Sequence, residues 1–199
     1  MILTTADEGL AVTPHGELVM NRSLYVGLVA SALTAGVAFT AHAKLSATGT
    51  SSVEFKATGP AGLSIVGKSS EVRASDTADS VTIVVPLAKL DTGIGLRNDH
   101  MRDKYLETSK YPNAELTVAK SAIGYPAVGA GEATGQLKLH GQTKPVKFKY
   151  EAKKSGTGHA VSGTVRVNMT EFGIEKPSYM GLSVKPDVDV AVTFNTADQ

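Results

Sequence analysis

Histidines and charged side chains are the groups in this sequence that could move protons or bind a metal ion. The 199-residue chain has five histidines, 20 Lys and Arg, 19 Asp and Glu, and no cysteine. His100, His140 and His159 lie far apart in the sequence, so each needs partners that only folding can supply. The lack of cysteine excludes thiol catalysis, disulfide bonds and cysteine-ligated zinc.

Motifs that would combine these groups into an active site are absent. The sequence has no His-Glu-x-x-His, no Gly-x-Ser-x-Gly and no phosphate-binding Gly-x-x-x-x-Gly-Lys motif. The charged stretch 97–104 is typical of a solvated helix face, and its functional alternative is a charged rim for a ligand head group. We therefore predict a protein that is not an enzyme, with no catalytic residue, metal or cofactor. An enzyme that uses His100 with neighbouring carboxylates remains an alternative hypothesis.

Residues 1–43 have the pattern of a leader followed by a secretory signal peptide. Arg22 precedes the uncharged run 23–41, and the sequence Ala-His-Ala then comes directly before Lys44. Acidic residues near the N-terminus do not fit a signal peptide, so we hypothesise that translation begins at Met20. We expect a bacterial protein that is periplasmic or secreted, with no membrane span after cleavage; an uncleaved membrane anchor is the alternative.

The remaining residues, 44–199, have the size and composition of one domain with an ordinary core. The whole chain is 42% hydrophobic and has a formal net charge of +1, without the basic excess of a typical nucleic-acid binder. We therefore expect no nucleic-acid partner.

Alternation of apolar and polar residues dominates this domain and predicts β-strands. Val188, Val190 and Val192, for example, alternate with Asp189, Ala191 and Thr193. The predicted strands are 53–59, 63–73, 80–87, 114–121, 132–139, 144–154, 159–168 and 186–196. Eight antiparallel strands can close into a barrel, whereas a two-layer sandwich with a filled core is the alternative.

One segment, 96–107, breaks the alternation and carries too much charge for a buried strand. Its apolar residues Leu96, Met101, Tyr105 and Leu106 predict a short amphipathic helix between strands that rests on the end of the barrel. Gly93 and Gly95, which precede it, predict a turn.

Several motifs of this sequence resemble the YceI-like family of exported bacterial lipid-binding proteins. They are LDTG (90–93), LRNDHM (96–101), KYPNA (110–114), HGQTKP (140–145), NMTEFGI (168–174) and VKPDV (184–188). The resemblance runs through residues 52–194 in the expected order. It implies a lipocalin-like, eight-stranded antiparallel barrel that binds a polyisoprenoid or a similar long-chain lipid inside, without established catalytic residues.

Under this interpretation the ligand lies against inward-facing apolar or amphipathic side chains. The candidate ligand-binding residues are Phe55, Ile65, Ile83, Leu96, Met101, Tyr105, Phe148, Val165, Phe172 and Tyr179. Each of them could equally be part of an ordinary packed core. The alternative function is a structural or stress-related periplasmic protein with a filled barrel and no dedicated ligand, and the oligomeric state, including a homodimer, stays open.

Overall fold

The structure is a computed structural model that describes residues 46–125, 128–179 and 181–197. The strands in this part of the chain are β1 (Ser46–Thr58), β2 (Ser64–Ser69), β3 (Arg73–Asp76), β4 (Ser80–Pro86), β5 (Asn113–Ala119), β6 (Gly129–Leu139), β7 (Gln142–Ser155), β8 (Gly158–Asn168), β9 (Ser178–Tyr179), β10 (Leu182–Ser183) and β11 (Asp187–Ala197). The predicted leader and signal peptide, residues 1–43, lies outside the described residues.

One antiparallel sheet contains all the strands except β9 and β10, which form a small hairpin of their own. The order in the sheet is β2-β1-β11-β8-β7-β6-β5-β4-β3. The longest ladders join β11 to β8, from Asp187 opposite Asn168 to Ala197 opposite Gly158, and β6 to β7. In β11 the alternation predicted from sequence separates the exposed Asp189, Ala191 and Thr193 from the less exposed residues between them.

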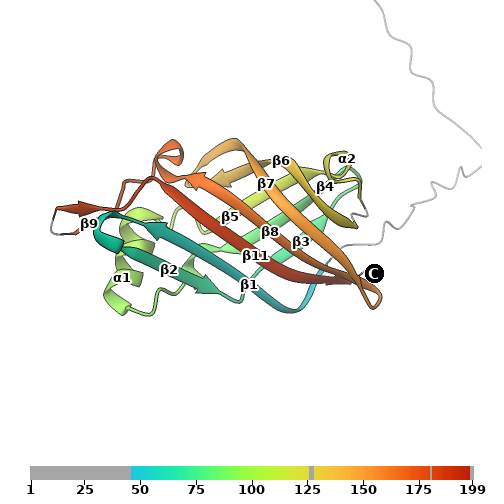
Figure 1. Cartoon of the computed structure of the whole chain (residues 1–199), viewed down its shortest axis with the longest axis horizontal. Helices are drawn as coiled ribbons and strands as arrows, with labels where there is room; N and C mark the ends of the chain where they lie inside the picture. Colours follow the sequence, from blue (N-terminus) through green and yellow to red (C-terminus); the bar gives the residue numbers. More distant parts are fainter. Residues whose placement is uncertain (1–45, 126–127, 180, 198–199) are drawn as a thin grey trace, which may run out of the picture. The chain divides into compact units, whose positions relative to one another are not determined.

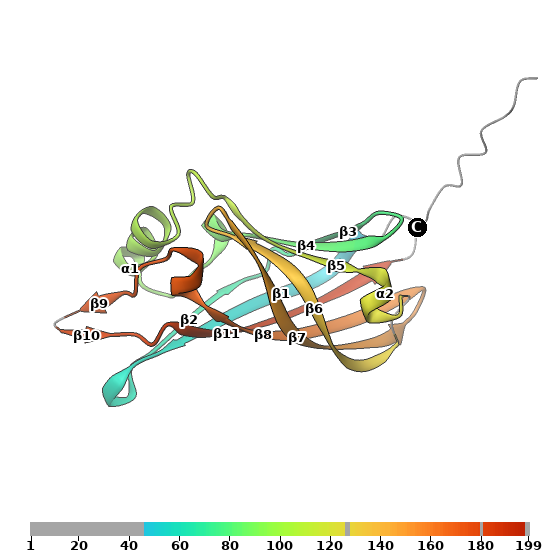
Figure 2. The same ribbon diagram turned by 90° about the horizontal axis from the view of Figure 1, so that it is seen from above.

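The sheet curls so strongly that its two edge strands, β2 and β3, come toward each other, which makes a half-barrel (Figures 1 and 2). The edge strand β3 lies against β1. An isolated bridge also joins β2 to the segment after β4, because Lys68 and Asp91 exchange two backbone hydrogen bonds of 2.8 Å. The predicted class, an antiparallel lipocalin-like barrel, is confirmed. The strand count differs, since the predicted strand 63–73 ends at Ser69 and a separate strand, β3, begins at Arg73.

The segment between β4 and β5 forms the predicted helix. It begins as α1 (Gly95–Asp99) and continues as a π-helix (His100–Tyr105), in which Leu106 N–H donates to the carbonyl of Met101 at 2.8 Å. Gly93 has a φ of +78°, which the predicted turn before the helix requires. Both figures place α1 at one end of the sheet and α2 (Lys120–Ile123) at the other.

Short 3₁₀ helices connect other strands. They are Pro60–Gly62, Leu87–Lys89 and Met169–Phe172. Among the described residues, no helix has the length and apolar character needed to cross a membrane.

Buried apolar residues form two clusters inside the curled sheet. The first cluster contains Val53, Val72, Ala74, Val81, Leu87, Leu90, Met101 and Phe194. The second contains Ala57, Leu137, Val167, Met169, Phe172, Ile174 and Val184. The second cluster joins the 3₁₀ helix that follows β8 to the ends of several strands, so it closes the core near α1.

Candidate ligand-binding site

The inward-facing side chains leave an internal cavity of about 890 Å³. Residues of β1, β2, β4, β5, β6, β7, β8 and β11 line it, and most of the lining side chains are aliphatic. The interior of the half-barrel is therefore hollow. A cavity of this size and character is typical of a site for a mostly apolar small molecule.

The cavity extends along most of the length of the sheet. Val167 and His159 both line it and lie eight residues apart on the same strand, β8. At about 3.3 Å per residue, this separation corresponds to roughly 26 Å. A long chain suits this space better than a compact ring system.

The structure places most of the residues predicted from sequence around this cavity. The candidates that line it are Phe55, Ile65, Ile83, Leu96, Met101, Tyr105, Phe148 and Val165. They come from strands β1, β2, β4, β7 and β8 and from the helical segment, so folding brings together residues that lie far apart in the sequence.

Of the other two candidates, Phe172 lies in the core, and Tyr179 is described only by its backbone. Phe172 is only 1% exposed and packs in the second buried cluster, because its 3₁₀ helix turns the side chain into the core; it does not line the cavity. Tyr179 belongs to β9, where its backbone pairs with Leu182. The side chain of Tyr179 lies outside the described part of the structure.

Sequence reasoning named the stretch that holds Arg97 and His100 as the alternative of a charged rim for a ligand head group, but it missed the other polar residues of the cavity. The polar lining consists of Thr92, Arg97 and His100 near α1, Ser178 of β9, Ser162 and Thr164 of β8, and Tyr125, Tyr150, His159 and Thr196 toward α2. For His159 a signal was present, since it shares the inward side of β8 with Val161 and Val165. The lining is thus mainly apolar, with polar side chains near both ends of the cavity.

Hydrogen bonds hold Arg97 in place at the α1 end. Its Nε donates to Thr92 Oγ1 at 2.9 Å, and its Nη2 donates to the Thr92 carbonyl at 2.6 Å. Asn98 Oδ1 accepts from the backbone N–H and the hydroxyl of Thr92, at 2.8 and 2.7 Å. Hydrogen bonds from Asn98 Nδ2 and then from Gly93 N–H lower the pKa of Asp91 below its ordinary value. This network positions one guanidinium at the end of an apolar cavity.

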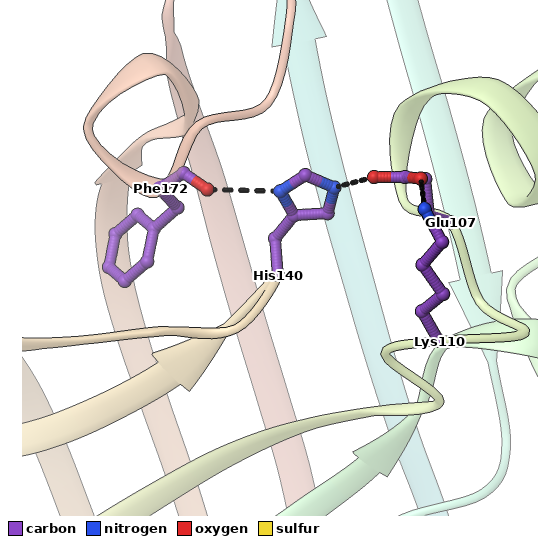
Figure 3. Close-up of polar contacts among 4 residues, drawn as sticks. All are labelled: Glu107, Lys110, His140 and Phe172. Carbon is purple, nitrogen blue, oxygen red and sulfur yellow. Dashed lines mark hydrogen bonds and ion pairs between the residues drawn. The ribbon is translucent and has the colours of Figure 1, made fainter.

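His140 forms a second network, which joins three connecting segments near the same end of the sheet (Figure 3). Its Nδ1 lies 3.1 Å from the carbonyl oxygen of Phe172, and its Nε2 lies 2.9 Å from Glu107 Oε2. Because a carbonyl and a carboxylate both accept, the ring satisfies both contacts when both nitrogens carry a proton. Lys110 Nζ donates to Glu107 Oε1 at 2.6 Å. The rings of Tyr111 and His140 pack in a T-shaped arrangement, with 4.7 Å between ring centroids.

The charges of this network shift the pKa values of two of its members. The hydrogen bond from Lys110, and then the one from His140, lower the pKa of Glu107, while the Glu107 carboxylate raises the pKa of Lys110. His140 does not line the cavity. Its contacts therefore tie the loops together and do not face a ligand.

No arrangement for metal chemistry is present in the described residues, where no group of three His, Asp or Glu side chains could hold a metal ion. His100 and His159 both line the cavity, but they lie near opposite ends of it.

Comparison with known proteins identifies the family. A family model of the YceI-like domain matches residues 35–196, which is most of the chain. The chain belongs to the YceI-like family. The resemblance inferred from its motifs is thereby confirmed.

Curated relatives of this YceI-like chain are UPF0312 proteins. One from Pseudomonas syringae pv. tomato is 29% identical over 128 residues, which are 61% of this chain and 64% of the relative. One from Vibrio cholerae serotype O1 is 31% identical over 126 residues, which are 60% of this chain and 64% of the relative. The matches thus span slightly less than two thirds of the length of these relatives.

Two solved structures share the fold of this YceI-like chain. A polyisoprenoid binding domain from Saccharophagus degradans, implicated in plant cell wall breakdown, has a TM-score of 0.63 and 22% identity, covering 78% of this chain and 98% of that domain. Burkholderia cenocepacia BcnA has a TM-score of 0.60 and 17% identity, covering 73% of this chain and 95% of that protein. At these identities the likeness establishes the fold alone.

Proposed function

We propose that the protein binds one long-chain amphiphile, such as a polyisoprenoid, inside the half-barrel and carries or sequesters it without chemical turnover. The observation that carries this proposal is the hollow, mainly aliphatic cavity of about 890 Å³. The shared fold with a polyisoprenoid binding domain is consistent with it. The cavity also argues against the alternative of a structural or stress-related protein with a filled barrel.

Removal of the ligand chain from water supplies the binding free energy. Each buried methylene contributes about 0.8 kcal/mol, so ten such groups contribute about 8 kcal/mol before the cost of ordering the chain and the ligand. The lining is rich in Val, Leu and Ile, which suits an aliphatic or isoprenoid chain. Side chains such as Ile83, Phe148 and Val165 then act as the contact surface.

The polar head of the ligand lies at the α1 end in this proposal. Arg97 lines the cavity there, already oriented by its bonds to Thr92, and His100 lines it one helical turn later. A guanidinium and an imidazole both suit a phosphate, carboxylate or carbonyl oxygen. The pre-formed network around Arg97 means that little side-chain ordering is needed when the head binds.

We place this activity in the periplasm or outside the cell. Support for this location comes from the sequence pattern of residues 1–43, which is that of a leader and a cleaved signal peptide. Mass analysis of the N-terminus of the protein recovered from the periplasm tests both the location and the cleavage, because cleavage predicts a chain that begins at Lys44. A mature chain that begins at Met1 or Met20 would contradict cleavage.

Native mass spectrometry tests the binding proposal directly. Protein purified from the periplasm is sprayed intact, extracted with solvent, and then incubated with geranylgeraniol added from a dilute ethanol stock. We expect one retained lipid of defined mass per chain before extraction, and uptake of one geranylgeraniol afterwards. A protein that carries no lipid and takes up no prenol would refute the proposal.

A further inference from the structure

Large apolar side chains are exposed at four positions in the described part of the chain. They are Ile94 (52% exposed), Leu96 (67%), Leu182 (45%) and Val128 (69%). The first three also line the cavity, and we call them the mouth rim. Val128 does not line the cavity and directly precedes β6.

The mouth rim comes from two segments at the same end of the sheet. Ile94 and Leu96 flank the first residue of α1, and Leu182 is the first residue of β10. Figures 1 and 2 both place α1 and the β9–β10 hairpin at this end. Apolar surface therefore continues from the inside of the cavity to the outside of the molecule.

Positive charge accompanies the mouth rim. Residues 94–105 and 175–185, which contain it, hold five Lys and Arg and three Asp and Glu. Lys176 and Lys185 lie on either side of the hairpin, and Lys104 lies on the helical segment; all three are exposed. Exposed apolar side chains among lysines are the pattern of a surface that binds an anionic membrane.

We infer that the mouth rim docks on the surface of a lipid bilayer that contains anionic lipid, with Ile94, Leu96 and Leu182 inserted among the head groups. This inference rests on the proposed function, because a lipid ligand is delivered to or taken from a membrane. A long apolar chain that crossed water would lose hydrophobic stabilisation with every exposed methylene. Docking places the apolar cavity in contact with the bilayer, so the chain moves between them without crossing water.

Vesicle flotation tests the inference with the complete mature protein. The vesicles are phosphatidylcholine alone, or phosphatidylcholine mixed with phosphatidylglycerol. The variants are Leu96→Asp and Leu182→Asp, and the matched control is Val128→Asp, which changes an equally exposed apolar residue outside the rim. Circular dichroism checks that each variant is folded, and Leu96→Ser replaces Leu96→Asp if that variant is not.

We expect the wild type and Val128→Asp to float with the mixed vesicles, and each rim substitution to reduce the bound fraction about tenfold. Added salt weakens the binding, since the lysines contribute to it. Wild-type protein that does not bind the mixed vesicles, or an equal loss for Val128→Asp and Leu96→Asp, would overturn the inference. Self-association of the wild type that Leu96→Asp abolishes, without vesicle binding, would assign the rim to a second copy instead.

The two proposals fail in distinguishable ways. Uptake of geranylgeraniol from solution by the wild type reports on the cavity and needs no membrane. Uptake without flotation refutes the docking surface alone. Flotation without uptake refutes the proposed function and leaves a membrane-binding surface without a carried lipid.

Discussion

A phenylalanine at position 163 would block the cavity near the middle of its length. Gly163 lines the cavity on β8, four residues from His159 and four from Val167. At about 3.3 Å per residue, it lies roughly 13 Å from each of these two positions. A Cβ at Gly163 would have the backbone oxygen of Lys149 as its neighbour, at an ordinary contact distance of 3.5 Å. We therefore expect Gly163→Phe to fold and to place its ring in the cavity.

The blocked cavity would exclude part of a long ligand but still accept a short one. Excluding only three methylenes removes about 2.4 kcal/mol of hydrophobic stabilisation, which corresponds to a roughly 60-fold increase in Kd. We expect this loss, or a larger one, for solanesol, and little change for the shorter prenol farnesol. The ratio of the two affinities separates a shortened cavity from general damage to the protein.

Calorimetric titration of delipidated protein with each prenol measures these affinities. The matched control is Ala191→Phe, which adds the same ring to an exposed position of the neighbouring strand β11. Gly163→Val provides a smaller obstruction if the phenylalanine variant is unstable in thermal unfolding. Folded Gly163→Phe that binds solanesol as tightly as the wild type would show that the ligand does not pass the middle of the cavity, and would refute the reasoning.

Three further substitutions test the contacts that shape the site. His140→Ala removes both hydrogen bonds of the ring, and we expect it to lower the free energy of unfolding by about 1–3 kcal/mol in urea titrations; unchanged stability would mean that the His140 network does not hold the loops. The lowered pKa of Glu107 predicts a stabilisation that is complete above its ordinary value of 4.5 and is lost as the pH falls through the lowered value. The difference in urea midpoint between wild type and Glu107→Gln should therefore be present at pH 7 and vanish in acid. A difference that stays constant with pH would contradict a stabilisation by the ionised Glu107 carboxylate. Gly67→Ala would bring a Cβ into collision with the ring of Phe55, so we expect the free energy of unfolding to fall by about 1–3 kcal/mol and the prenol affinity to change. We expect no such fall for Gly95→Ala, where nothing lies within 4 Å of the added Cβ.

Strand content was predictable from sequence because it depends on a local pattern. Alternation identified the cores of the long strands, and its interruption identified the helical segment that contains Met101 and Tyr105. The break between Ser69 and Arg73 was missed, since residues on both sides of it continue to suit a strand. Within this break the backbone N–H of Val72 donates to the hydroxyl of Ser51 on β1, a contact between residues far apart in the chain that a local pattern does not reveal.

The site was only partly predictable, for a related reason. Inward-facing positions such as Phe55, Ile83 and Val165 follow from alternation and do line the cavity. Phe172 belongs to a motif of the family, but a 3₁₀ helix buries its side chain in the core. His140 gains its partners only when three segments that lie far apart in the sequence meet at one end of the sheet.

The sequence by itself determined the antiparallel strands, the intervening helix and membership of the YceI-like family, because periodicity and short motifs are properties of contiguous residues. Only the tertiary structure decided that the interior is hollow. The same Val, Leu and Ile side chains line a cavity or fill a core according to the distance across the sheet. That distance depends on the number of strands, their tilt and their curl, which arise from pairings between residues far apart in the chain.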